Sequence, residues 1–382
     1  MSDYQRLSLF DIKLGQPLPF SVYDKAGILL LKTGCSINVE RHLEILIANG
    51  LYFKPEQVKH RTSAPEPEAP NSEANTFFVL DAAKLKLLRL FDQYRDGGVK
   101  DDFVGRIDTL ASTVMDACSH DTDAALANLH LDYETSYAVV HHMQAAILCE
   151  IMGKKLKVNE STRLSLIKAA LTHDMDLLDI QDDLDKQITS LDSYQKERIR
   201  AHPQNSERIL RKLGVTDALW LNAVEHHHER LDGSGYAYAL SGDAINITTR
   251  ILAVADIYSA MIRDRPYRKA MLSNEAMRQL LLEQGKKADL RLIQLLIKEV
   301  GVFPPGALVQ LANNEISVVK ERKVNSVCPT VYSFIRSSGM PMISPLKRET
   351  ENAEHKVTNI VSFSNYRRSI AIIRGLWLQT AA

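Results

Sequence analysis

The stretch TRLSLIKAALTHDM, residues 162–175, combines a helical apolar pattern with a polar His-Asp ending. Its apolar residues recur at spacings of three and four, which is the period of one face of an α-helix. The same spacing recurs on both sides of it, in FVGRIDTLASTVMDACS (103–119), SYAVVHHMQAAILCEIMGKKL (136–156) and INITTRILAVADIYSAMI (245–262). No alternating strand pattern interrupts these segments. Residues 77–310 are therefore predicted to form an all-α domain.

The flanking regions have a different character. Residues 1–58 predict a small α+β regulatory module, with a β-hairpin turning at 24–27 and a helix at 38–50 that Asn38 and Gly50 would begin and end. Residues 59–76 are rich in Pro, Glu, Ala and Ser and predict a linker.

The C-terminal region, residues 311–382, completes a short β-hairpin and continues as a polar tail. ALVQL (307–311) and ISVV (316–319) predict the two strands of this hairpin, and TVYSF (330–334) is a candidate third strand. The predicted fold class is thus mainly α, with a small N-terminal α+β module and a short C-terminal β-hairpin.

Composition limits the classes of partner. Lys and Arg total 47 and Asp and Glu total 47, so no net field attracts DNA or an anionic membrane. The four cysteines are scattered without a C-x-x-C spacing, which favours reduced thiols. The N-terminus has no signal-peptide pattern and no apolar stretch reaches 18 residues, so we expect a cytoplasmic protein without a membrane partner. The sequence does not predict the oligomeric state.

Nine of the twelve histidines fall between His120 and His228, inside the predicted helical domain. A single histidine on a helix is usually a hydrogen-bonded core or boundary residue. Asp256 is more unusual because apolar residues surround it, and a carboxylate there must be paired, capped or bound to metal. Histidines and aspartates spread over several helices, with one adjacent His-Asp pair, suit two divalent cations that share a carboxylate. Imidazole and carboxylate ligands suit Mn, Fe, Zn or Ni.

The order of these motifs resembles the HD-GYP branch of the HD-domain phosphohydrolases over about residues 133–310. The matching motifs, in chain order, are His173-Asp174, His202-Pro203, HHERLDGSGY (227–236), RILAVADIY (250–258) and RPYR (265–268). His141 lies thirty-two positions before His173, where the family has its first ligand. The resemblance implies an HD-domain helical bundle.

The resemblance also implies roles for individual residues. One metal ion would take His141, His173, Asp174 and Asp256, and a second would share Asp174 and add His202, His227 and His228. His173 and Asp174 would be central to catalysis, and Tyr236, Arg265 and Arg268 would contact the substrate. The two ions would be Fe or Mn, and the reaction would be hydrolysis of cyclic di-GMP to pGpG or GMP.

The chain departs from the family pattern at four motifs. The lysine of His-Asp-x-Gly-Lys is Leu177, and Asp176 adds an acid beside it. Tyr137 stands where some members have a glutamate for a third metal, so we expect two ions at most. Ala237 replaces the proline of Gly-Tyr-Pro, and Ser259 replaces a second aspartate after Asp256. Losing one electrostatic donor costs about 10²–10³ in rate at comparable sites, which predicts a slow enzyme.

Two alternatives stay open at the level of sequence. A degenerate member would bind cyclic di-GMP, or a partner such as a diguanylate cyclase, without turnover, and Leu177 and Ala237 favour this interpretation. The second alternative is an HD phosphohydrolase of another nucleotide, since metal ligands specify phosphate-ester chemistry better than they specify the base. His226 has no counterpart in the motif and is predicted to lie outside the ligand set.

Overall fold

A computed structural model describes residues 75–378, with gaps at 99–101, 133–134, 185–186, 264–269, 285–286 and 324–326, and a few short segments between residues 5 and 53. The chain divides into two compact units, Met1–Glu73 and Ala74–Ala382. Each unit is described by itself. Within the described residues, no helix has the length and apolar character needed to cross a membrane.

The first unit contains a small antiparallel sheet in the order β1-β4-β2-β3. Its strands are β1 (Gln5–Arg6), β2 (Val22–Tyr23), β3 (Leu29–Leu31) and β4 (Tyr52–Phe53). β2 pairs with β3, as the predicted hairpin requires. The turn at 24–27, the predicted helix at 38–50 and residues 59–74 of the predicted linker lie outside the described residues.

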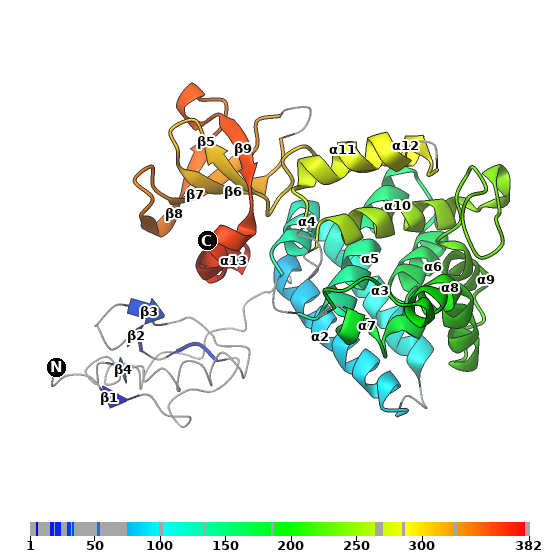
Figure 1. Ribbon diagram of the computed structural model, residues 1–382. Helices are drawn as coiled ribbons and strands as arrows, with labels where there is room; N and C mark the ends of the chain where they lie inside the picture. The colour runs from blue at the N-terminus through cyan, green and yellow to red at the C-terminus, as the bar shows by residue number, and fades with distance from the viewer. Residues whose placement is uncertain are drawn as a thin grey trace. The chain divides into compact units, whose positions relative to one another are not determined.

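The second unit begins with a bundle of helices (Figure 1). The longer ones are α2 (Thr76–Arg95), α3 (Phe103–His120), α4 (Thr122–His130), α5 (Tyr137–Lys155), α6 (Glu160–Ala170), α8 (Ser193–Lys212), α9 (Ala218–His226), α10 (Ile247–Met261), α11 (Ser273–Gln284) and α12 (Leu290–Val300). Short helical segments are η2 (Met175–Leu177), α7 (Gln181–Leu184) and η3 (Gly242–Ala244). The mainly helical fold predicted from the sequence is confirmed.

Helix α5 forms the centre of the bundle. Every residue from Val139 to Gly153 is buried, and a helix that is buried on all sides belongs in a core. It packs against α3, α6 and α10, among others. The polar side chains that α5 carries into this core therefore need partners on the neighbouring helices.

The helices that lead into the site have well-defined starts. The Asp192 carboxylate accepts from the Gln195 N–H and Gln195 returns a hydrogen bond to the Asp192 N–H, which is a capping box at the start of α8. Asn159 caps α6 and Asp217 caps α9 through side-chain oxygens that accept backbone N–H groups of the first turn. Each such cap stabilises its helix by about 1 kcal/mol.

The C-terminal part of the second unit is larger than the predicted hairpin. It is a five-stranded antiparallel sheet in the order β8-β7-β6-β5-β9, followed by a helix. Its elements are β5 (Leu308–Leu311), β6 (Ile316–Glu321), β7 (Thr330–Ile335), β8 (Pro341–Glu349), η4 (Ala353–His355), β9 (Val357–Val361), η5 (Phe363–Ser369) and α13 (Ile370–Leu378). The two predicted strands and the candidate third strand are β5, β6 and β7. The region predicted to be a polar tail contains β8, β9 and the apolar helix α13. The edge strands β8 and β9 expose polar side chains and lack a continuous apolar run, so the sequence pattern did not predict them.

Candidate metal centre

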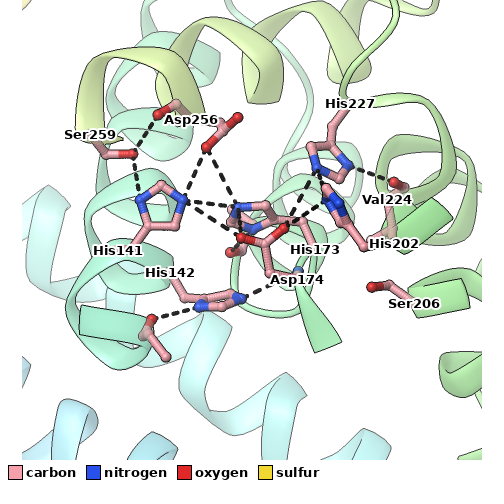
Figure 2. Close-up of polar contacts among 12 residues, drawn as sticks. His141, His142, His173, Asp174, His202, Ser206, Val224, His227, Asp256 and Ser259 are labelled. Atoms are coloured by element: carbon pink, nitrogen blue, oxygen red, sulfur yellow. Dashed lines mark hydrogen bonds and ion pairs between the residues drawn. The ribbon is translucent and has the colours of Figure 1, made fainter. Parts of the chain in front are cut away.

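The first group of candidate ligands joins three helices (Figure 2). His141 lies in α5, Asp256 lies in α10, and His173 follows the end of α6. The Nε2 atoms of His141 and His173 are 3.4 Å apart, and Asp256 Oδ1 lies 3.0 Å from His141 Nε2 and 3.8 Å from His173 Nε2. Three predicted ligands from distant parts of the sequence thus have their donor atoms within 3.8 Å of one another.

The second group combines α8 with the segment after α9. His202 Nε2 lies 3.1 Å from His227 Nε2, and the ring of His228 lies 4.9 Å from the ring of His202. Each of these three residues offers a nitrogen atom within 4.8 Å of the others. The same closeness holds for His141, His173 and Asp174 in the first group.

Asp174 lies between the two groups, and each of its oxygens faces one of them. Oδ1 is 3.0 Å from His202 Nε2 and 3.7 Å from His227 Nε2. Oδ2 is 3.8 Å from His141 Nε2 and 3.6 Å from His173 Nε2. This is the arrangement that a carboxylate shared by two cations requires.

Helix ends orient two of the histidines. The last carbonyl groups of a helix have no partner within the helix. His173 follows α6, and its Nδ1 donates to the carbonyl of Ala170 at 2.9 Å. His227 follows α9 and donates in the same way to Val224 at 2.6 Å. Because Nδ1 donates to the helix end, Nε2 of each ring faces the centre, where it can bind a cation once it is unprotonated.

Proline orients a third histidine inside α8. Pro203 has no N–H, so the carbonyl of Ile199, four residues earlier, receives no helical hydrogen bond from it. His202 Nδ1 donates to this carbonyl at 2.6 Å, and His202 Nε2 then points to the centre. The His-Pro pair of the sequence therefore has a local physical reason.

Ser259 occupies the position where the family pattern has a second aspartate. Its hydroxyl donates to the carbonyl of Asp256 at 2.9 Å and lies 3.1 Å from His141 Nδ1. A hydroxyl that is already donating accepts from the imidazole N–H, so Ser259 fixes the ring of His141 with Nε2 toward the centre. Ser259 thus orients His141 without a carboxylate at this position.

The charges in the centre suit cation binding. Burial alone would raise the pKa of the carboxyl groups of Asp174 and Asp256, but neighbouring imidazoles hold both pKa values well below the usual range. Burial, with the nearby His202 imidazole, lowers the pKa of His228 to about 4. Burial would also lower the pKa of His173, yet the Asp174 carboxylate raises it to about 9. At neutral pH the carboxylates are ionised and His228 is neutral, which are the forms that donate to a divalent cation, whereas His173 is protonated and would release a proton on binding one.

A pocket of about 210 Å³ opens beside the second group and is lined in part by His227, His228 and Tyr236. The ring of Tyr236 stacks on His228 at 4.8 Å and 30°. Gly235 permits this contact, because a Cβ atom there would meet backbone atoms of residues 228–230 at 2.5–2.6 Å. The Asp-Gly-Ser-Gly-Tyr loop therefore shapes the wall of the pocket.

The other predicted residues have mixed outcomes. Arg265 and Arg268 lie outside the described residues. His226 belongs to neither group, since its Nδ1 donates to the carbonyl of Asn222 at 2.9 Å. The ring of Tyr137 stacks on His141 at 5.2 Å. Leu177 is buried, with 7% of its surface exposed.

Sequence reasoning missed the roles of His142 and Glu229. His142 is buried against His173, and its Nε2 lies 3.4 Å from the backbone nitrogen of Asp174, which it fixes in place. The Glu229 carboxylate accepts from the backbone N–H groups of Tyr238 and Leu240 at 2.6 and 2.9 Å, and so holds the loop after Tyr236. The only signal in the sequence was position, since His142 directly follows His141 and Glu229 directly follows His228.

Comparison with known proteins identifies the class of this bundle. Residues 124–292 match the family described as HD domain. The chain is similar to a solved HDG"Y"P protein from Bdellovibrio bacteriovorus, with a TM-score of 0.51 and 17% identity over 77% of this chain and 98% of that one. The fold and the resemblance to the HD-GYP branch are thereby confirmed.

Curated relatives of this chain are named as phosphodiesterases of cyclic dinucleotides. The chain is 28% identical to a cyclic di-GMP phosphodiesterase of Pseudomonas aeruginosa over 66% of this chain and 60% of the relative. It is 33% identical to 3'3'-cGAMP-specific phosphodiesterase 3 of Vibrio cholerae over 38% of this chain and 32% of the relative. The chain thus spans between about a third and three fifths of these relatives. The HD domain and the histidine-aspartate groups together indicate divalent-metal binding.

Proposed function

We propose that this protein is a metal-dependent phosphodiesterase that hydrolyses cyclic di-GMP to pGpG or GMP in bacterial second-messenger signalling. The observation that carries the proposal is Asp174, whose two oxygens face two separate groups of histidines. Relatives named as cyclic di-GMP phosphodiesterases support the substrate. A cytoplasmic location suits a substrate of this kind.

The donor set fits two transition-metal ions, which we propose to be Fe or Mn. His141, His173, Asp174 and Asp256 would hold one ion, and Asp174, His202, His227 and His228 would hold the other. A bound ion of this kind supplies Lewis acidity toward a phosphate oxygen and makes a bound water more acidic. Nitrogen-rich sites of this type favour transition metals over Mg²⁺.

The protein's own side chains would position the substrate. Tyr236, stacked on His228 at the pocket wall, would contact the nucleotide next to the second ion. Arg265 and Arg268 would donate to phosphate oxygens, as guanidinium groups commonly do. Leu177 leaves the centre without the lysine that the family places there, so we expect slow turnover.

Two other functions compete with this one. Relatives named as 3'3'-cGAMP-specific phosphodiesterases make a mixed cyclic dinucleotide the second candidate substrate. A sensor that binds cyclic di-GMP without turnover, or that docks a diguanylate cyclase, is the alternative that Leu177 and Ala237 favour.

One experiment separates these functions. Protein loaded with Mn²⁺ or Fe²⁺ is incubated with cyclic di-GMP or 3'3'-cGAMP, products are resolved by chromatography, and binding is measured calorimetrically on the same preparation. We expect linear dinucleotide or GMP from cyclic di-GMP. Tight binding without any product over hours would replace the enzyme with a sensor, and product from 3'3'-cGAMP alone would change the substrate.

A further inference from the structure

The pocket beside the second histidine group has a cationic wall that the candidate metal ligands do not explain. Arg230, Arg250 and Lys287 all line it, together with His228 and Tyr236. Arg230 directly follows Glu229, whereas Lys287 lies between α11 and α12. A backbone hydrogen bond from the Leu231 N–H to the Lys287 carbonyl, at 2.8 Å, brings these two segments together.

The three cations differ in what they contact. The Arg250 guanidinium is fully engaged: it lies 3.0 Å from Asp243 and 3.5 Å from Asp289 and donates to two backbone carbonyls. Arg230 and Lys287 make no ion pair and no side-chain hydrogen bond with the residues that the structure describes. The Arg250 guanidinium is therefore committed to existing contacts. Arg230 and Lys287 line the pocket and act electrostatically on the exposed Asp232 carboxylate, which is not part of the lining, but form no ion pair with the described residues.

The acids that line the same pocket do not neutralise these charges. Asp289 is held by Arg250 and Arg291 and accepts from the Arg291 backbone N–H. The buried Glu229 carboxylate is occupied by two backbone N–H groups. An anionic ligand group is what Arg230 and Lys287 can bind without displacing an existing contact.

The size and position of the pocket limit what that group can be. Whole drug-sized ligands occupy pockets of about 300–1,000 Å³. At about 210 Å³, this pocket takes one part of a larger molecule whose other part reaches the adjoining centre through His227 and His228. Apolar side chains, Ile245 and Ile257 among them, form other parts of the wall and suit the nucleoside beside the anion.

We propose that Arg230 and Lys287 bind a second phosphate group of the substrate while the first lies at the metal centre. The site then selects molecules with two phosphodiester groups over molecules with one. This inference rests on the proposed function and deepens it, because it assigns a specificity role to two residues outside the metal-ligand set.

The test compares two substrates in charge-removing variants. Arg230→Gln and Lys287→Gln are made in the full chain, loaded with Mn²⁺, and assayed with cyclic di-GMP, which has two phosphodiesters, and with bis(p-nitrophenyl) phosphate, which has one. Each hydrogen bond to a charged group is worth about tenfold or more in affinity. We expect the ratio of kcat/KM for cyclic di-GMP to kcat/KM for bis(p-nitrophenyl) phosphate to fall about tenfold in each variant.

The matched control is Lys212→Gln, which removes one charge from the exposed end of α8, away from the pocket. It should leave that ratio unchanged. Thermal unfolding of all variants checks the fold, and both target side chains are partly exposed, so their substitution should leave it intact. A ratio in Arg230→Gln and Lys287→Gln equal to that of the control would overturn the inference.

Calorimetry keeps this inference separate from the proposed function. If the metal-loaded wild type hydrolyses neither substrate, the proposed function fails, and the dissociation constant of cyclic di-GMP becomes the readout. A constant about tenfold weaker in Arg230→Gln and in Lys287→Gln than in Lys212→Gln supports the second phosphate site. Equal constants, or no binding of cyclic di-GMP by the wild type, overturn it.

Discussion

Replacing Asp174 tests the central feature of the site, which is one carboxylate shared by two histidine groups. Its oxygens lie 3.0 Å from His202 Nε2 on one side and 3.6 Å from His173 Nε2 on the other. Asp174→Ala therefore removes a ligand from both proposed ions at once. It also leaves Asp256 as the one carboxylate of the proposed ligand set to offset the charge of both ions.

The expected loss is large. Residues that merely orient a metal ligand cost about 10–100-fold in metal affinity when mutated, so a ligand common to both ions should cost at least about 100-fold at each. We expect about two ions per chain in the wild type and fewer than about 0.5 in Asp174→Ala. His202→Ala, which alters the second group alone, should retain about one.

Elemental analysis after metal loading and gel filtration gives these numbers directly. His226→Ala is the matched control, because His226 adjoins the ligand histidines in sequence but bonds to Asn222 and belongs to neither group. It should bind as much metal as the wild type. Two ions retained by folded Asp174→Ala, or a metal-free wild type after loading, would refute the shared-carboxylate reasoning.

Three further predictions follow from single contacts. Leu177→Lys restores the cation of the family pattern and should raise kcat for cyclic di-GMP about tenfold at constant metal content, as steady-state kinetics will check. Gly235→Ala places a Cβ about 2.5 Å from backbone atoms and should raise KM more than tenfold in the same assay while both ions stay bound. Hydrogen bonds from Arg348 lower the pKa of Glu315 to about 2, so its contribution is complete above about pH 4.5 and fades as the pH falls toward 2. Urea unfolding should show Glu315→Gln less stable by about 1–2 kcal/mol at pH 7 and by less at pH 3, with exposed Glu349→Gln as the near-neutral control.

The candidate ligands could be predicted because their chemistry is visible in residue type and order. A carboxylate among apolar residues, as at Asp256, is costly unless it is bound, so the sequence marks it without any knowledge of the fold. The helical period then indicated which segments form the bundle. Neither signal reports which helix faces which, and the distances of 3.0–3.8 Å within the first group depend on that packing.

Other features depend on contacts that local pattern does not encode. Trp377 of α13 packs on Phe77 of α2 at 5.8 Å, so the C-terminal helix is stabilised by a residue from the far end of its unit. The strand β8 has no continuous apolar run and pairs with β7 through its backbone. The segments of Arg230 and Lys287 meet through one backbone hydrogen bond, from the Leu231 N–H to the Lys287 carbonyl, and no periodicity predicts such a pairing.

The departures from the family pattern share one physical property, which is that none removes a donor atom from the proposed ligand set. Ser259 keeps the Nδ1 contact that orients His141, and Tyr137 adds a ring beside the same histidine. Leu177 and Ala237 would instead change what surrounds a bound phosphate. We therefore expect metal binding and substrate turnover to be separable in this chain, because the proposed donors are all present whereas the lysine of the family pattern is not. Arg230 and Lys287 line the pocket and are not among the proposed metal ligands, so their substitution should affect substrate selection and leave metal content unchanged.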